Sequence, residues 1–218
     1  MLKRLLSYLY PIRILRKPSD VSQSLELTYV NGKLLLDSEN ANYSYGSLQR
    51  VLFFGLQQIG FEKIREMNDV LVLGVAGGSV IESLDKIGFR GRITGVEIDA
   101  EVIEIARKYY NLDRFSNLEI VVADASEFMR SNRKKYDLIV IDVFTDRNMP
   151  MFLYDEDFVD SVLSSLQTNG FILFNTIVLD DMMQQLNNQY CAHVRSRNYS
   201  FEVLPRQETY NELIVVKN

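Results

Sequence analysis

The stretch Val70-Leu-Val-Leu-Gly74-Val-Ala-Gly77-Gly78-Ser-Val80 joins a short apolar run to a turn of small residues and then to a segment of helical character. A second apolar run, Ile93-Thr-Gly-Val-Glu97-Ile-Asp99, reaches the carboxylate of Glu97 23 positions after Gly74 (97 − 74). A strand, a glycine-rich turn, a helix and a second strand that ends on an acid form the βαβ unit that binds nucleotides. The two runs therefore predict a nucleotide-binding α/β domain.

Small residues in the turn give a ligand access to the backbone. They leave room where a larger side chain would collide, and the first turn of the following helix presents unpaired amides. The predicted cofactor-binding residues of the turn are Gly74, Ala76, Gly77 and Gly78. Glu97 is expected to accept hydrogen bonds from ribose hydroxyls, and its neighbour Ile98 belongs to the same predicted site. The alternative is a tight strand-to-helix connection without a ligand.

The spacing within the turn bears on the kind of cofactor. A dinucleotide site requires glycine at the first, third and sixth places, where this chain has Gly74, Ala76 and Ser79. The S-adenosylmethionine version is looser and expects a third strand that ends on a carboxylate. The run from Leu118 to Asp124 supplies that strand, and Asp124 with the neighbouring Ala125 is expected to bind the adenine edge. The pattern favours S-adenosylmethionine or its decarboxylated form over NAD.

Strands and helices are expected to alternate from residue 70 onward, which is typical of a parallel sheet with helices on both faces. The expected strands are 70–74, 93–98, 118–123, 137–142 and 170–175, and the expected helices are 79–88, 100–110, 125–131, 155–166 and 179–196. Two closing strands, 201–205 and 211–217, form an antiparallel hairpin. The predicted fold class is α/β, with a doubly wound, mostly parallel seven-stranded sheet.

The region before residue 70 predicts a smaller appendage. Residues 24–30 and 33–37 are two runs joined by Asn31-Gly32, a strong hairpin signal. Residues 45–59 carry a helical stripe of apolar side chains that ends at Gly60. We expect residues 1–44 to form an N-terminal segment with a β-hairpin, and residues 45–218 to form the adenosyl-cofactor-binding domain.

Composition argues against several classes of function. The chain has 218 residues, of which 47% are hydrophobic, enough for a full core. Its net charge of −5 argues against nucleic-acid binding, which requires a basic face. One cysteine, Cys191, and one histidine, His193, exclude an internal disulfide and a metal site built from several such ligands. We therefore expect no metal and a cytoplasmic location.

The opening residues, 1–10, are basic and apolar. They are too short to span a bilayer and lack a small-residue cleavage site before Pro11. An amphipathic helix that packs on a partner subunit or on the body of the protein is the favoured interpretation. Membrane contact is the minor alternative, and we expect no membrane partner.

Asp142 ends the strand that we expect to carry chemistry. Ligands of a doubly wound sheet bind outside the carboxyl ends of the strands, so the residues just after each strand matter most. Tyr136-Asp-Leu-Ile-Val-Ile-Asp142 is an apolar run that ends on an acid, expected beside the reactive end of the cofactor. The alternative is that Asp142 caps the following loop and that Asp146 with Arg147 forms a solvated pair.

These residues resemble the spermidine synthase (polyamine aminopropyltransferase) family, and more closely its divergent members, within the class I S-adenosylmethionine-dependent methyltransferase-like fold. The motifs that carry the resemblance are Leu-Leu-Leu-Asp37, Val-Leu-Gly74-Val-Ala-Gly-Gly-Ser, Val-Glu97-Ile-Asp99, Ala-Asp124-Ala and Tyr-Asp-Leu-Ile-Val-Ile-Asp142. The resemblance implies that Glu97 holds ribose, Asp124 holds adenine and Asp142 takes a proton from the attacking amine. With the apolar opening segment, it also suggests a homodimer.

The resemblance implies transfer of an aminopropyl group to an amine. An amine is cationic at neutral pH, so the site needs a carboxylate that binds it and accepts its proton, as Asp142 would. The residues predicted to line the pocket for the small-molecule amine are Asp146, Tyr45 and Gln49.

Two departures from the family keep other functions open. The family carries an Asp in the glycine turn where this chain has Gly77, and a second Asp three places after the catalytic one where this chain has Thr145. The alternatives to aminopropyl transfer are a methyltransferase with the same cofactor site, a nucleoside-binding relative without turnover and, last, an NAD-linked reductase.

Overall fold

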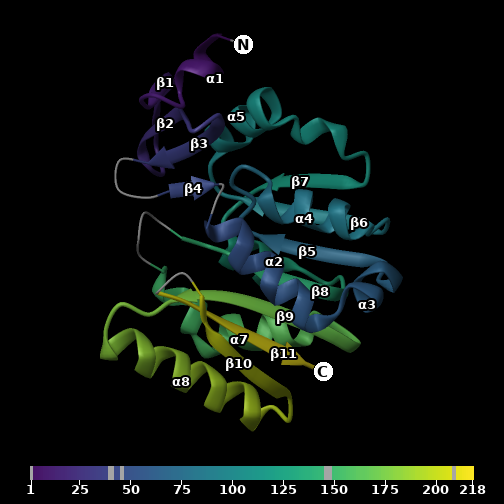
Figure 1. Ribbon diagram of the computed structural model, residues 1–218. Helices are drawn as coiled ribbons and strands as arrows, with labels where there is room; N and C mark the ends of the chain where they lie inside the picture. The colour runs from purple at the N-terminus through teal and green to yellow at the C-terminus, as the bar shows by residue number, and fades with distance from the viewer. Residues whose placement is uncertain (1, 39–41, 45–46, 145–148, 208–209) are drawn as a thin grey trace.

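A seven-stranded sheet forms the centre of the molecule. The computed structural model describes residues 2–38, 42–44, 47–144, 149–207 and 210–218. Within them the strand order is β10-β11-β9-β8-β5-β6-β7. The last five of these strands run parallel, whereas β11 is antiparallel to both β9 and β10. The bounds are β5 Asp69–Leu73, β6 Arg92–Glu97, β7 Leu118–Val122, β8 Tyr136–Ile141, β9 Leu166–Ile177, β10 Ser200–Gln207 and β11 Asn211–Lys217. The predicted α/β fold class is confirmed (Figure 1).

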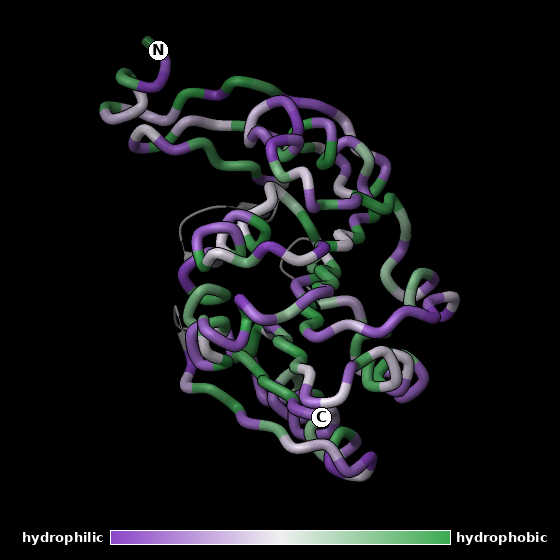
Figure 2. Tube along the Cα trace, turned by 90° about the vertical axis from the view of Figure 1, so that its right-hand side faces the viewer, coloured by the Kyte–Doolittle hydropathy of each residue, from purple (hydrophilic) through white to green (hydrophobic). Residues whose placement is uncertain are grey.

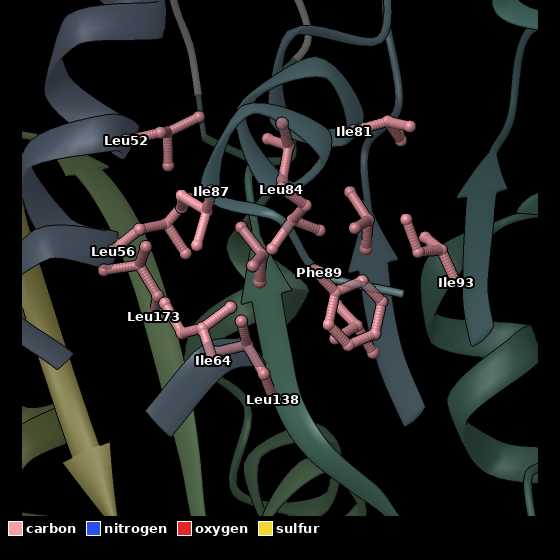
Figure 3. Packing of buried hydrophobic residues seen from close by; sticks show 14 of the residues in the cluster. Leu52, Leu56, Ile64, Ile81, Leu84, Ile87, Phe89, Ile93, Leu138 and Leu173 are labelled. Carbon is pink, nitrogen blue, oxygen red and sulfur yellow. The ribbon is translucent and has the colours of Figure 1, made fainter. Parts of the chain in front are cut away.

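Helices cover both faces of this sheet, which explains why β5 and β8 each contain a run of four consecutive buried apolar side chains, residues 70–73 and 138–141. One face carries α2 Ser47–Ile59, α3 Phe61–Glu66, α4 Ser79–Ile87 and α5 Ala100–Tyr110. The other carries α6 Ala125–Ser131, α7 Glu156–Ser164 and α8 Asp181–Ser196. Figure 3 shows Leu56 of α2, Ile64 of α3 and Leu84 of α4 gathered over Leu138 and Leu173 of the sheet. Burial of these side chains fixes the helices on the strands.

A smaller sheet precedes the main one. Its order is β1-β2-β3-β4, with bounds β1 Ile12–Ser19, β2 Gln23–Val30, β3 Lys33–Ser38 and β4 Asn42–Ser44, and the short α1 Leu2–Leu6 lies before it. The expected hairpin is present as β2 and β3, but two further strands flank it. The alternation of apolar and polar residues that would mark β1 as a strand is obscured by its charged residues and by Pro18, which an edge strand tolerates. Figure 2 shows this sheet as segments of mixed hydropathy at one end of the molecule.

The small sheet is packed against α5. Leu25, Leu27 and Leu36 of the strands and Val102 and Ile105 of the helix form one buried cluster. Helix α5 therefore has apolar contacts on two sides, toward the main sheet and toward the N-terminal strands.

Several element boundaries differ from the sequence-based expectation. Helix α3 was not expected, and β9 begins four residues earlier than the expected start at residue 170 (170 − 166). Its early part is irregular, because the pairing with β8 shifts register between Tyr136 and Leu138. Two short 3-10 helices, η1 Leu112–Arg114 and η2 Met151–Tyr154, also connect the larger elements.

Candidate functional site

The carboxyl ends of the parallel strands meet along one edge of the main sheet. Leu73 at the end of β5 pairs with Val96 of β6 on one side and with Ile141 of β8 on the other. After β5 the chain moves outward to β6 and β7, and then returns to place β8 on the opposite side of β5. This reversal is a topological switch point, where ligands of doubly wound sheets bind. In Figure 1 the arrowheads of β5 and β7 point toward the side on which β4 lies.

The glycine turn after β5 is shaped by contacts within the protein. Gly74 has a positive φ of 87°, and a Cβ there would collide with the backbone carbonyl oxygen of Asp142. Gly78, the N-cap of α4, is also left-handed, and a Cβ there would lie 2.7 Å from Cδ1 of Leu112. Close internal packing thus requires these two glycines, as the alternative of a tight strand-to-helix connection anticipates, whether or not a ligand also approaches the turn.

Glu97 closes the glycine turn through hydrogen bonds. Its Oε2 accepts from the amides of Val75 at 3.2 Å and Ala76 at 3.0 Å, and its Oε1 accepts from the amide of Asp99 at 3.1 Å. The side chain is buried, and burial raises the pKa of Glu97 while the amide hydrogen bonds act in the opposite direction. The three amides use three of the roughly four acceptor positions of a carboxylate, which leaves capacity for a further donor.

Asp124 lies beside this strand end and caps the next helix. Its Oδ1 accepts from the amides of Ser126 at 2.8 Å and Glu127 at 3.0 Å, so Asp124 is the N-cap of α6. The preceding residue, Ala123, donates its amide to the backbone carbonyl of Glu97 at 3.0 Å, which places the ends of β6 and β7 side by side. Asp124 as an adenine-binding residue stays a prediction.

Two apolar members of the predicted cofactor site differ in exposure. Ile98, next to Glu97, is 47% exposed, although it is an aliphatic residue in a well-packed domain. Ala125, next to Asp124, is the first residue of α6 and is buried in the core. An exposed aliphatic side chain beside a carboxylate offers apolar surface to a flat base, whereas Ala125 offers only its backbone.

Asp142 follows β8 at the switch point. Its amide donates to the carbonyl of Leu73 at 2.8 Å, and its Oδ1 accepts from the Nδ2 of Asn175 at 2.8 Å. The pKa of Asp142 is raised to about 6. Burial is the largest cause, the hydrogen bond from Asn175 opposes it, and the negative charge of Glu97 adds to the rise. The field of Glu97 thus reaches Asp142, so the structure brings these two predicted site residues together.

Of the three residues predicted for the amine pocket, only Gln49 belongs to the part of the chain that the structure describes. Tyr45 and Asp146 lie outside the described residues. Gln49, in the first turns of α2, is partly buried, and its Nε2 lies 3.4 Å from Oε2 of Glu82 in α4. Its role toward an amine stays a prediction.

Asn175 is a site residue that the sequence analysis missed. It is fully buried near the end of β9, and its side chain contacts Asp142. Asn175 is the last residue of the expected strand 170–175, so the rule that singled out the acids at the strand ends would have identified it had it been extended to amides. Asn211 at the start of β11, whose Nδ2 donates to Oδ1 of Asn175, is not at the carboxyl end of a strand, so the same rule would not have identified it.

The described part of the chain has neither a metal-binding cluster nor a membrane-spanning helix. Within it, no group of three or more His, Cys, Asp or Glu side chains is arranged to hold a metal ion. No helix there has the length and hydrophobicity to cross a bilayer.

The sheet topology and its acidic edge define a class I methyltransferase-like α/β protein, and solved structures share this fold. Spermidine synthase from Thermotoga maritima superposes with a TM-score of 0.73 at 16% identity, covering 94% of this chain and 72% of that one. Human methyltransferase-like protein 13, solved in complex with SAH, gives a TM-score of 0.65 at 22% identity, covering 78% of this chain and 82% of that one.

Residues 55–216 match the spermine/spermidine synthase domain, and the chain belongs to that family. The polyamine aminopropyltransferase of Vibrio vulnificus is 26% identical over 149 residues, which are 67% of this chain and 49% of that protein. The chain spans about half the length of this curated relative and a smaller share of several others. The predicted membership of the spermidine synthase-like family is confirmed.

Proposed function

We propose that this chain transfers an aminopropyl group from decarboxylated S-adenosylmethionine to a small-molecule amine. The observation that carries the proposal is Asp142, a carboxyl group at the switch point with a pKa raised to about 6 by burial. The family match and the polyamine aminopropyltransferases among the relatives support the class of reaction.

The residues at the strand ends fit an adenosyl group. Glu97 offers a carboxylate to ribose hydroxyls, Asp124 offers one to the exocyclic amine of adenine, and the exposed Ile98 offers apolar surface to the base. Within the described residues, none of the three acids of this edge, Glu97, Asp124 and Asp142, has a cation as its partner. When bound, the sulfonium of the adenosyl group would supply an electrophilic carbon to the amine nitrogen and a neutral thioether as the leaving group, because the carbon–sulfur bond breaks as the carbon–nitrogen bond forms.

Asp142 serves the acceptor amine in two successive roles. As a carboxylate it attracts the ammonium form of the acceptor and orients it. It then accepts a proton, which leaves the amine nitrogen with the lone pair needed for attack. A base with a pKa of about 6 is ionised at neutral pH yet basic enough to take up a proton in the transition state.

Calorimetry and product analysis test this proposal together. We expect decarboxylated S-adenosylmethionine to bind more tightly than S-adenosylmethionine, and incubation with di- and triamines to yield a product heavier by one aminopropyl group. Asp142→Asn should retain nucleoside binding within a few-fold and lose at least about 100-fold in transfer rate, as expected for removal of a general base. Equal transfer by Asp142→Asn would exclude Asp142 as the base.

Methyl transfer is the second candidate function. Gly77 favours it, because the acidic residue that the family resemblance implies at this place in the glycine turn is absent. Human methyltransferase-like protein 13 shares the fold of this chain, which is compatible with methyl transfer. Tighter binding of S-adenosylmethionine than of its decarboxylated form, with a product heavier by one methyl group, would establish this function instead. Nucleoside binding with neither product indicates a relative without turnover.

A further inference from the structure

A chain of three polar side chains connects Asp142 with the last strand of the main sheet. Asn211 at the start of β11 donates its Nδ2 to the Oδ1 of Asn175 at 3.1 Å. Asn175 in turn donates its Nδ2 to the Oδ1 of Asp142 at 2.8 Å. The exposed fractions of Asn175 and Asn211 are 0% and 7%, so both amides are removed from water.

The register of the sheet produces this arrangement. Ile141 of β8 pairs with Phe174 of β9, so that Asp142 comes level with Asn175 one residue further along each strand. In the neighbouring strand Asn175 pairs with Leu213, and Asn211, two residues earlier, points to the same face of the sheet. Three adjacent strands each contribute one member.

The direction of the hydrogen bonds is set by chemistry. An ionised carboxylate only accepts, so Asn175 must present its amide nitrogen to Asp142. Its carbonyl oxygen then faces away and, being buried, requires a donor, which Asn211 supplies. Rotation of the Asn175 amide by half a turn would set two acceptors against each other at Asp142 and two donors against each other at Asn211.

We propose that Asn175, held in orientation by Asn211, is a positioning residue that fixes the Asp142 carboxylate and stabilises its ionised form. Its catalytic consequence rests on the aminopropyl transfer proposed above. Within the described residues Oδ1 is occupied by Asn175, whereas Oδ2 has no donor, so one defined oxygen is presented to the acceptor.

Other groups near Asp142 do not replace this donor. Among the charged groups on the described elements around it, Glu97 of β6 is the one whose field reaches Asp142, and its charge opposes ionisation. Neighbouring β5 is followed by Gly74, which has no side chain, and β9 offers Asn175 itself. Without the Asn175 amide, the rise in the pKa of Asp142 that burial and the charge of Glu97 cause would no longer be opposed by this hydrogen bond.

Carbon-13 NMR of aspartate side chains measures the titration of Asp142 directly, with its signal assigned by its absence in Asp142→Asn. Asn175→Leu, of similar shape but without hydrogen-bonding groups, should raise the pKa of Asp142 by about one unit. The acid limb of the transfer rate should move to higher pH by the same amount. Asn211→Leu should give a smaller rise, and no additional rise when combined with Asn175→Leu.

Thr176→Val is the matched control. Thr176 is equally buried in β9, but it donates to the carbonyl of Glu212 on the other face of the sheet. It should destabilise β9 without moving the titration of Asp142. An unchanged titration in Asn175→Leu, or an equal shift in Thr176→Val, would overturn the proposal. If Asn175→Leu does not fold, Asn211→Leu provides the same test with Asn175 in place.

The two proposals fail separately. A shifted titration in a protein that transfers no aminopropyl group leaves the positioning role intact and removes the function. Aminopropyl transfer by the wild-type protein, together with an unchanged titration of Asp142 in Asn175→Leu, would support the proposed function and overturn the positioning role of Asn175.

Discussion

Asp142 illustrates a conflict between stability and activity within one residue. Burial favours its neutral form, whereas binding of an ammonium and uptake of its proton require the carboxylate. The raised pKa means that the folded protein holds this proton more tightly than the unfolded chain does, between the ordinary value of 3.8 and about 6. Stability therefore falls as the pH rises through this window and stays lowered above it.

Substitution of Asp142 by Asn should remove this cost. We expect the variant to exceed the wild-type protein in free energy of unfolding by about 1–3 kcal/mol at pH 8, with a smaller difference at pH 4, where Asp142 is protonated in the folded state. Urea denaturation at the two pH values measures the difference. A variant that is less stable than the wild type at pH 8 would show that ionised Asp142 carries no net cost.

Gly74 supports Asp142 through the backbone. Its positive φ of 87° and the nearby carbonyl of Asp142 leave no room for a side chain. Gly74→Ala should lower the free energy of unfolding by roughly 2–4 kcal/mol, the sum of backbone strain and the displaced Asp142 segment. Gly60→Ala is the control, because Gly60 shares a positive φ of 105° but has only the end of Lys63 near its Cβ position. An equal loss of stability in both variants would show that backbone strain alone accounts for the cost and that the Asp142 segment is not displaced.

At the scale of elements, the small N-terminal sheet reaches the predicted cofactor site through the end of β1. Ser19 donates its Oγ to Oδ2 of Asp99 at 2.5 Å, and Oδ1 of Asp99 caps α5 by accepting from the amide of Glu101. The amide of Asp99 is bound in turn to Glu97. One buried hydroxyl thus links the small sheet to the loop that carries the ribose-binding candidate.

Ser19→Ala should loosen this connection. We expect a loss of about 1–3 kcal/mol in stability, because a buried charged acceptor loses its donor, and faster hydrogen exchange in the first turn of α5. Ser7→Ala is a suitable control, since the Ser7 hydroxyl is also buried but bonds to Arg4 and Gly32 within the N-terminal region. Equal exchange rates in α5 for both variants would show that Ser19 does not support the helix.

At the scale of the whole molecule, the two sheets share α5. Its residues Val102 and Ile105 are buried against Leu25, Leu27 and Leu36 of the small sheet. We therefore propose that the two predicted parts of the chain, residues 1–44 and 45–218, unfold together as one cooperative unit. The apolar side of α5 would be exposed to water if the small sheet were lost.

Calorimetry of Leu27→Ala tests this cooperativity. The substitution should cost roughly 2–5 kcal/mol, and the single unfolding transition of the chain should move as a whole to lower temperature. A second transition that stays at the wild-type temperature would mean that the α/β domain is stable without the small sheet.

The sequence by itself determined the elements of the nucleotide-binding unit. Strand β5, the glycine turn and the acids at the ends of β6, β7 and β8 follow from periodicity and from short motifs, because neighbouring residues alone decide these features. The family resemblance rested on the same local patterns. The hairpin of β2 and β3 was equally visible, because Asn31 and Gly32 both adopt the positive φ that its turn requires.

Only the tertiary structure decided which side chains complete the site. Asn175 contacts Asp142 across 33 positions of sequence, and Ser19 contacts Asp99 across 80. Such pairs depend on strand register and on the packing of one sheet against a helix, to which no local pattern refers. Burial, which raises the pKa of Asp142 and makes the orientation of Asn175 matter, is likewise a property of the folded chain, because water leaves only when distant segments meet.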